Sequence, residues 1–208
     1  MDQSFFLRGV AIGFSIAAPV GPIGVLCIRR TLAEGRLSGF ASGLGAATAD
    51  AVYGCVAGFG LTAVSNLLVS QQTWLRLIGG LFLCYLGVKN FLARPAQSAA
   101  APKGGALAGA YASTFLLTLT NPMTILSFAA VFAGLGLGDG ATDYAGAALL
   151  VLGVFVGSTL WWLFLSGGVS LFREKLNEGH FRWVNRISGT IIAGFGLACL
   201  MNFGRGNS

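Results

Sequence analysis

Two clusters of helix-breaking residues interrupt long apolar segments of the chain, and they constrain its fold more than any other feature. The first cluster is Pro19-Val20-Gly21-Pro22 and the second is Asn121-Pro122. Proline lacks a backbone N–H and clashes with the preceding turn, so Pro122, for example, should free the carbonyl of Thr118. Lipid cannot supply a partner for such a group, and non-helical backbone inside a membrane is therefore expected only against protein, water or a bound ligand. We predict two broken membrane helices whose breaks line a binding site.

Composition places the whole chain in a membrane. The 208 residues are 55% hydrophobic and only 10% charged, with a mean hydropathy of +0.76, which is far from the average of soluble domains. Six segments have the roughly 18 apolar residues that a spanning helix needs. They lie near residues 5–28, 37–64, 72–92, 107–136, 144–170 and 183–204. The predicted fold is an all-α integral membrane protein with six transmembrane helices, and the first is a helix rather than a signal peptide because Asp2, not a basic cluster, precedes it.

The helices divide into two halves of one transmembrane domain that covers residues 1–208. Half one is residues 1–92, residues 93–106 form a linker rich in Ala, Pro and Gly, and half two is residues 107–208. Because each half has three helices, a second half built like the first enters the membrane from the opposite side. This predicts a 3+3 inverted repeat in which helices 1 and 4 are broken. Interruptions in corresponding positions of two halves point to a transporter's binding site.

The basic residues indicate the orientation of the chain in the membrane. Ten of the 13 Lys and Arg residues fall on one side of the predicted spans. These are Arg29, Arg30, Arg36, Lys89, Arg94, Lys103, Arg173, Lys175, Arg182 and Arg186. By the positive-inside rule, this side faces the cytoplasm and both termini lie outside it. The net charge of +6 therefore reports topology, and we expect no nucleic-acid partner.

Asp50 is the one acidic residue that falls in the middle of a predicted helix. An aspartate at a helix centre costs about 3 kcal/mol on insertion scales, so it marks a functional site by default. Its helical neighbours are Ala46, Ala47, Tyr53 and Gly54, which form a largely small face suited to burial against another helix. Two interpretations follow. Asp50 is either a structural contact to a neighbouring helix or a coupling residue that exchanges a proton for a cationic group.

The breaks and Asp50 together suit a zwitterionic ligand. The helix N-terminus after each break favours a carboxylate, whereas Asp50 and freed carbonyls favour an ammonium group. The side-chain amide of Asn121 both donates and accepts hydrogen bonds, although it could also serve only as a local cap. The candidate substrate-binding or coupling residues are Asp50, Pro19, Gly21, Pro22, Asn121 and Pro122.

At these residues the chain resembles the LysE/RhtB family of amino-acid exporters. Members of that family carry a Pro-Gly-Pro signature in helix 1, an acidic residue in helix 2 and Asn-Pro in helix 4, and here Pro19 to Pro22, Asp50 and Asn121-Pro122 match these positions. The chain departs from the compact signature by inserting Val20. The resemblance implies six membrane helices, location in the bacterial cytoplasmic membrane, and export of amino acids driven by a proton or ion gradient. The predicted cargo is a neutral or a basic amino acid.

Other classes of membrane protein fit the residues less well. An ion or metal exporter should place several His, Cys, Asp or Glu ligands in the membrane, and an intramembrane enzyme should cluster catalytic groups such as His-Glu-x-x-His. A non-transporting membrane protein has no need for a buried acid beside two broken helices. We therefore expect an amino-acid antiporter that is not an enzyme, has no cofactor or metal, and has an amino acid, a coupling ion and the lipid bilayer as partners. The oligomeric state is left open, with a homodimer as one option.

Overall fold

A computed structural model of the chain describes residues 3–19, 21–58, 71–93, 104–121, 124–125, 127–128, 144–172 and 178–203. Val20, Pro122, residues 94–103 of the predicted linker and several of the charged residues used for topology lie outside these ranges. The described elements are all α-helices, as predicted. They are α1 (Gln3–Ala17), α2 (Pro22–Glu34), α3 (Arg36–Gly58), α5 (Gln72–Phe91), α6 (Gly104–Leu119), α8 (Tyr144–Ser170) and α9 (Glu178–Phe203).

These helices fall on the six apolar segments of the sequence. Two of them contain stretches that are long and apolar enough to cross a membrane, Tyr144–Ser170 and Arg182–Met201. The stretches Ser4–Ala17 and Pro22–Glu34, which meet at 81°, make a third if they form one broken span. The apolar stretches of α5 and α6 are shorter, Leu77–Phe91 and Gly105–Leu119. The membrane character of the chain is thus supported, while six spans stay a prediction.

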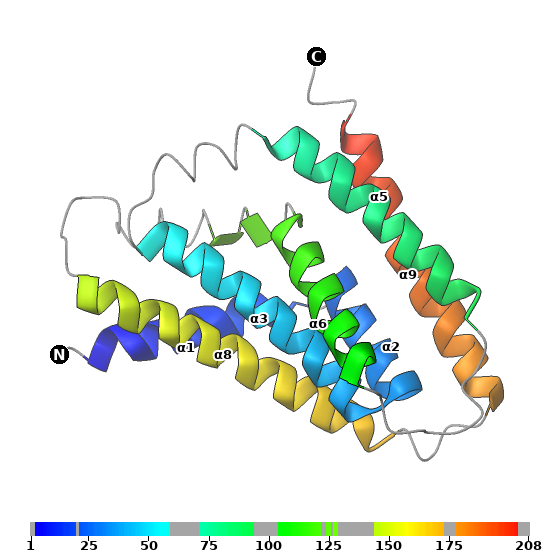
Figure 1. Cartoon of the computed structure of the whole chain (residues 1–208), viewed down its shortest axis with the longest axis horizontal. Helices are drawn as coiled ribbons and strands as arrows, with labels where there is room; N and C mark the ends of the chain where they lie inside the picture. Colours follow the sequence, from blue (N-terminus) through cyan, green and yellow to red (C-terminus); the bar gives the residue numbers. More distant parts are fainter. Residues whose placement is uncertain are drawn as a thin grey trace.

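The described helices pack as a group of four, a group of two, and α2 between them (Figure 1). In the group of four, α8 contacts α1 and α3, and α3 contacts α6. The other group is the pair α5 and α9, which lie side by side along their length. This pair reaches the other helices mainly through α2, which contacts α3, α8 and α9. The short helix α2 therefore joins the two groups.

Glycines allow α1 and α8 to lie in close contact. A Cβ atom on Gly9 would collide with the carbonyl oxygen of Leu150, and one on Gly157 would collide with that of Val10. Small residues serve this purpose in membranes, where lipid gives no hydrophobic drive for helix association. Any side chain at these glycines would push the two helices apart.

A single residue, Gly35, turns the chain from α2 into α3. Its φ of 106° lies in a region that glycine reaches without the steric cost of a Cβ atom. Its N–H donates to the carbonyls of Arg30 and Thr31, both at 3.1 Å, which closes the end of α2. This tight turn brings the last turns of α2 against the first turns of α3, and it positions the polar network described below.

Candidate functional site

The chain is broken between α1 and α2, as the sequence predicts. Helix α1 ends at Ala17, and α2 begins with Pro22 directly after Gly21, whose φ of −100° and ψ of −164° are extended. Proline suits the first position of a helix because its missing N–H would have no helical partner there. No side chain described by the structure caps this start of α2. The first N–H groups of α2 are therefore left for another acceptor.

A second interruption follows α6. This helix ends at Leu119, and the N–H of Asn121 donates to the carbonyl of Thr118 at 3.2 Å. The sequence predicted that Thr118 would lose its helical donor, and in the structure a turn supplies this replacement. The N–H of Ile125 donates to the carbonyl of Asn121 at 3.2 Å. Pro122 itself lies outside the described residues.

Asp50 is buried on α3 and faces α8. The hydroxyl of Ser158 donates to Oδ2 of Asp50 at 2.6 Å, and the indole Nε1 of Trp162 donates to Ser158 Oγ at 3.2 Å. Asp50 is only 3% exposed, so the prediction that it points into the protein rather than into lipid is confirmed. The indole N–H orients the hydroxyl of Ser158, and this hydroxyl in turn holds one carboxylate oxygen of Asp50.

One cavity of about 340 Å³ brings Asp50 together with both interruptions. Its lining includes all the predicted site residues that the structure describes, which are Pro19, Gly21, Pro22, Asp50 and Asn121. Ile23 and Gly24, from the uncapped start of α2, also line it. The cavity therefore has a carboxylate on one wall and the positive end of a helix on another.

The rest of the lining is mixed in character. Hydroxyl groups come from Thr118, Thr124 and Ser127. Apolar surface comes from Ile16, Ile23, Leu83, Trp162 and Phe195. Most ligand sites combine an apolar wall with a few convergent polar groups in this way. Such a lining suits a small molecule that carries both charges and an uncharged part.

Sequence reasoning missed several of these residues. Ser158 and Trp162 lie one helical turn apart on α8. Ser158 could have been recognised from the sequence, because a hydroxyl in so apolar a segment usually forms a hydrogen bond with another group. Trp162 packs against Gly43 and also lines the cavity. Thr118 was named only for its backbone carbonyl.

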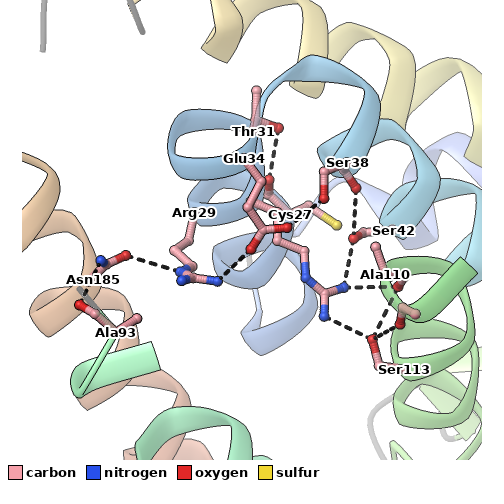
Figure 2. Close-up of polar contacts among 12 residues, drawn as sticks. Cys27, Arg29, Thr31, Glu34, Ser38, Ser42, Ala93, Ala110, Ser113 and Asn185 are labelled. Carbon is pink, nitrogen blue, oxygen red and sulfur yellow. Dashed lines mark hydrogen bonds and ion pairs between the residues drawn. The ribbon is translucent and has the colours of Figure 1, made fainter. Parts of the chain in front are cut away.

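The sequence analysis placed Arg29 and Arg30 just after the first predicted span, residues 5–28. Helix α2 continues to Glu34, so both arginines lie on a helix. Arg30 is buried, and its guanidinium donates to the hydroxyl of Ser42, the carbonyl of Ala110 and two further hydroxyls, all within 2.9 Å (Figure 2). Those hydroxyls belong to Ser113 and Thr114. A single side chain on α2 thus links α3 to α6.

Arg29 makes the corresponding link to α9. Its Nη1 donates to Glu34 at 2.9 Å, and its Nε donates to Oδ1 of Asn185 at 3.1 Å (Figure 2). No local sequence pattern indicates this network, because its members are spread from α2 to α9. Among the described residues, no group of three or more His, Cys, Asp or Glu could hold a metal ion.

The comparison with protein families identifies the chain. A family model described as LysE type translocator matches residues 14–202. The chain belongs to this family. The resemblance noted in the sequence is therefore confirmed, and the family is one of membrane transporters.

Individual relatives agree with this assignment. One relative is named as the putative amino acid efflux protein YcgF of Bacillus subtilis (strain 168). It is 30% identical to this chain over 200 residues, which cover 93% of this chain and 94% of YcgF. The threonine efflux protein of Escherichia coli (strain K12) is 27% identical over 152 residues, 66% of this chain and 70% of that protein. The uncharacterized membrane protein YahN of the same strain is 29% identical over 175 residues, 82% of this chain and 77% of YahN. No solved structure gives a significant match.

Proposed function

We propose that this chain is a secondary exporter that carries amino acids out across the bacterial cytoplasmic membrane in exchange for protons. The observation that carries the proposal is the cavity in which Asp50 meets the residues of the broken helices. The LysE type translocator family and the efflux names of the relatives support amino acids as the cargo.

The substrate would lie across the cavity between its two charged walls. The α-carboxylate would accept hydrogen bonds from the N–H groups of Ile23 and Gly24 at the start of α2, where the helix dipole is positive. The α-ammonium would bind the carboxylate of Asp50. The side chain would face the apolar wall that includes Leu83 and Phe195.

The single carboxylate among the described residues of the cavity, that of Asp50, can pair with one cationic group of the substrate. A neutral amino acid needs only that one partner for its ammonium, and the apolar wall then receives its side chain. A basic amino acid carries a second cation, for which the hydroxyls of Thr118, Thr124 and Ser127 offer neutral acceptors. Both remain candidates, as the sequence indicated.

Asp50 would couple transport to protons. Its carboxyl would bind a proton when the ammonium is absent and release it when the ammonium arrives, so that the two cations occupy the site in turn. In the alternative interpretation, Asp50 only bonds to Ser158 to hold α3 against α8. If Asp50 is the coupling residue, its substitution abolishes proton-driven transport. If it is only a structural contact, its substitution lowers stability and leaves transport intact.

The packing of the helices supports an inverted repeat. The first part of each interrupted helix packs against the second helix of the other half: α1 against α8, and α6 against α3. The second helices, α3 and α8, contact each other, and so do the third helices, α5 and α9. Exchanging the halves therefore leaves this set of contacts unchanged, which is the pattern expected of a two-fold axis.

The positions of the basic residues indicate the orientation of the chain in the membrane. The end of α2, the end of α5 and the start of α9 adjoin, since Asn185 bonds to both Arg29 and the carbonyl of Ala93. Six of the described basic residues belong to these helix ends or to the start of α3, whereas Arg8 lies on α1 and Arg76 near the start of α5. The six are Arg29, Arg30, Arg36, Lys89, Arg182 and Arg186. We place this end in the cytoplasm and both termini outside it.

Uptake into inside-out membrane vesicles tests the function. In such vesicles an exporter moves substrate inward, and an acidic lumen drives the movement. We expect labelled neutral or basic amino acids to accumulate when a pH gradient is imposed, and the gradient to dissipate faster when substrate is added. Accumulation of no amino acid under any gradient would rule out the proposal.

Asp50→Asn tests the coupling residue in the same assay. We expect it to abolish gradient-driven uptake while the protein stays inserted and monodisperse in detergent. Asp143→Asn, which removes an acid that the sequence places in a loop, is the matched control and should transport normally. Full retained transport in Asp50→Asn would assign this acid to the structural role.

A further inference from the structure

The first turns of α9 form a basic hollow on the outside of the molecule, separate from the transport cavity. Gly179, Arg182, Trp183 and Arg186 line it, and its volume is about 230 Å³. These residues are spaced three, four and seven positions after the first, so they share one face of the helix. Asn185, which bonds to Arg29 and Ala93, is buried on another face. Because Arg182, Trp183 and Arg186 are exposed, the hollow opens outward, beside the end of α5.

The two arginines in the hollow can both donate hydrogen bonds to an anion. Neither forms an ion pair with any carboxylate whose side chain the structure describes, where Arg29 and Glu34 make such a pair. The guanidinium carbon of Arg186 lies 6.0 Å from the ring centre of Phe91. A cation–π contact uses the face of the ring and leaves the N–H groups of the guanidinium free to donate. Two planar donors one helical turn apart suit the oxygens of a phosphate.

The hollow also lies at the edge of a membrane span. The apolar stretch of α9 begins at Arg182, and Trp183 beside it is 65% exposed. Exposed tryptophans at the end of a span are typical of the boundary between headgroups and acyl chains. Further along the same side of the helix, Ile187 and Ile191 are exposed as well. An apolar strip thus continues from the basic hollow toward the membrane interior.

We propose that this face of α9 is a binding site for an anionic phospholipid. The phosphate would bind between Arg182 and Arg186, the glycerol region would lie against Trp183, and an acyl chain would follow Ile187 and Ile191. A soluble phosphate would use the arginines but would gain nothing from the tryptophan and the apolar strip. The inference does not depend on the transport proposal, because it uses none of the cavity residues.

Native mass spectrometry of the full chain tests the site. We would present phosphatidylglycerol and phosphatidylcholine to the protein in detergent and measure the affinity of each. We expect phosphatidylglycerol to bind more tightly than phosphatidylcholine. The double variant Arg182→Gln, Arg186→Gln should weaken phosphatidylglycerol binding about 25-fold, since each basic residue at a membrane surface contributes roughly a factor of five. Phosphatidylcholine binding should change little.

A matched variant tests whether lipid binding depends on these two arginines or only on the net charge of the protein. Arg8→Gln, Arg36→Gln removes the same charge at two exposed positions outside the hollow, and it should bind phosphatidylglycerol like the original protein. The double variant Arg182→Lys, Arg186→Lys keeps both positive charges and should retain most of the phosphatidylglycerol binding. This result would show that the glutamine variant loses the lipid because it lacks the charges and not because it misfolds. Trp183→Ala should weaken lipid binding without changing its dependence on the anion.

Three results would overturn the proposal. The first is equal binding of phosphatidylglycerol and phosphatidylcholine. The second is an equal loss of phosphatidylglycerol in the Arg8, Arg36 control. The third is displacement of the lipid by inorganic phosphate at concentrations where phosphatidylglycerol binds, which would mean that the site takes a soluble anion.

Discussion

Arg29 of α2 donates a hydrogen bond from Nε to Oδ1 of Asn185 on α9, at 3.1 Å (Figure 2). Asn185 in turn donates from Nδ2 to the carbonyl of Ala93, two residues after the end of α5, at 3.2 Å. The pair α5 and α9 contacts the other helices mainly through α2, so this bond joins the two groups of helices. The cavity lies between the same groups, since Leu83 and Phe195 of the pair line it together with Asp50.

The first prediction is that Asn185→Ala loosens the pair α5 and α9 from the other helices. The change removes the acceptor of Arg29, and a hydrogen bond to a charged group contributes about 1.5–3 kcal/mol, which corresponds to tenfold or more in an equilibrium between open and closed arrangements. The readout is the labelling rate of Cys199, a cavity residue, by a water-soluble thiol reagent. Cys27, Cys55 and Cys84 are replaced by alanine so that only Cys199 reacts. We expect labelling to become about tenfold faster.

Two further variants test whether loss of the bond between Arg29 and Asn185 causes the faster labelling. Asn185→Asp keeps an acceptor for Arg29 and loses only the donor to Ala93, so labelling should stay slow. Thr190→Ala changes an exposed position on the same helix and should leave the rate unchanged. If Asn185→Ala labels at the original rate, the bond does not limit access to the cavity.

The second prediction concerns the buried guanidinium of Arg30. Because its donors reach acceptors on both α3 and α6, an ammonium at this position cannot replace them all, and Arg30→Lys is not a conservative change. We expect Arg30→Lys to lower the free energy of unfolding by roughly 1.5–3 kcal/mol, the contribution of hydrogen bonds to a charged group. Arg36→Lys at an exposed position is the control. Thermal unfolding of both in the same detergent measures the difference, and equal midpoints would show that the network adds no stability.

The third prediction is that Ser158→Ala slows proton-driven uptake. The hydroxyl holds one oxygen of Asp50 at 2.6 Å, and loss of such a bond, at about 1.5–3 kcal/mol, corresponds to roughly a 10- to 100-fold lower rate if Asp50 must keep this orientation in the transition state. Ser158→Thr keeps the hydroxyl and should transport at close to the original rate. A stabilising role alone would lower the thermal midpoint of Ser158→Ala and leave uptake per folded molecule unchanged.

The sequence was sufficient to predict features that depend on local chemistry. Proline and glycine impose the break between α1 and α2 whatever surrounds them, and a lone aspartate among small apolar residues has to be buried inside the protein. For this reason the break and the burial of Asp50 could be predicted from the residues themselves. The meeting of Asp50, Pro22 and Asn121 around one cavity was expected from the idea of paired broken helices rather than from any local pattern.

The polar network at the end of α2 could not be predicted in the same way. Arg30 follows Arg29 and precedes a turn, a pattern that is typical of basic residues after a membrane span. Its burial depends on hydroxyls from α3 and α6, and Ser113 is 83 positions away. Such contacts depend on how the helices pack, and a single sequence carries no record of that. The same limit explains why Ser158 was missed as the partner of Asp50.

The last prediction tests the break itself. Pro22→Ala restores an N–H that can donate to the carbonyl of Ala18, and with Pro19→Ala in the same chain the backbone can continue as one helix from α1 into α2. The start of α2 would then no longer present unbonded N–H groups to the cavity, so we expect the double variant to insert normally but to lose gradient-driven uptake in inside-out vesicles. Pro122→Ala should impair uptake for the same reason. Pro95→Ala, Pro102→Ala in the predicted linker is the matched control and should transport normally, while Pro22→Gly should keep the break and much of the activity. Normal uptake in both the Pro19, Pro22 variant and Pro122→Ala would exclude the broken helices from the substrate site.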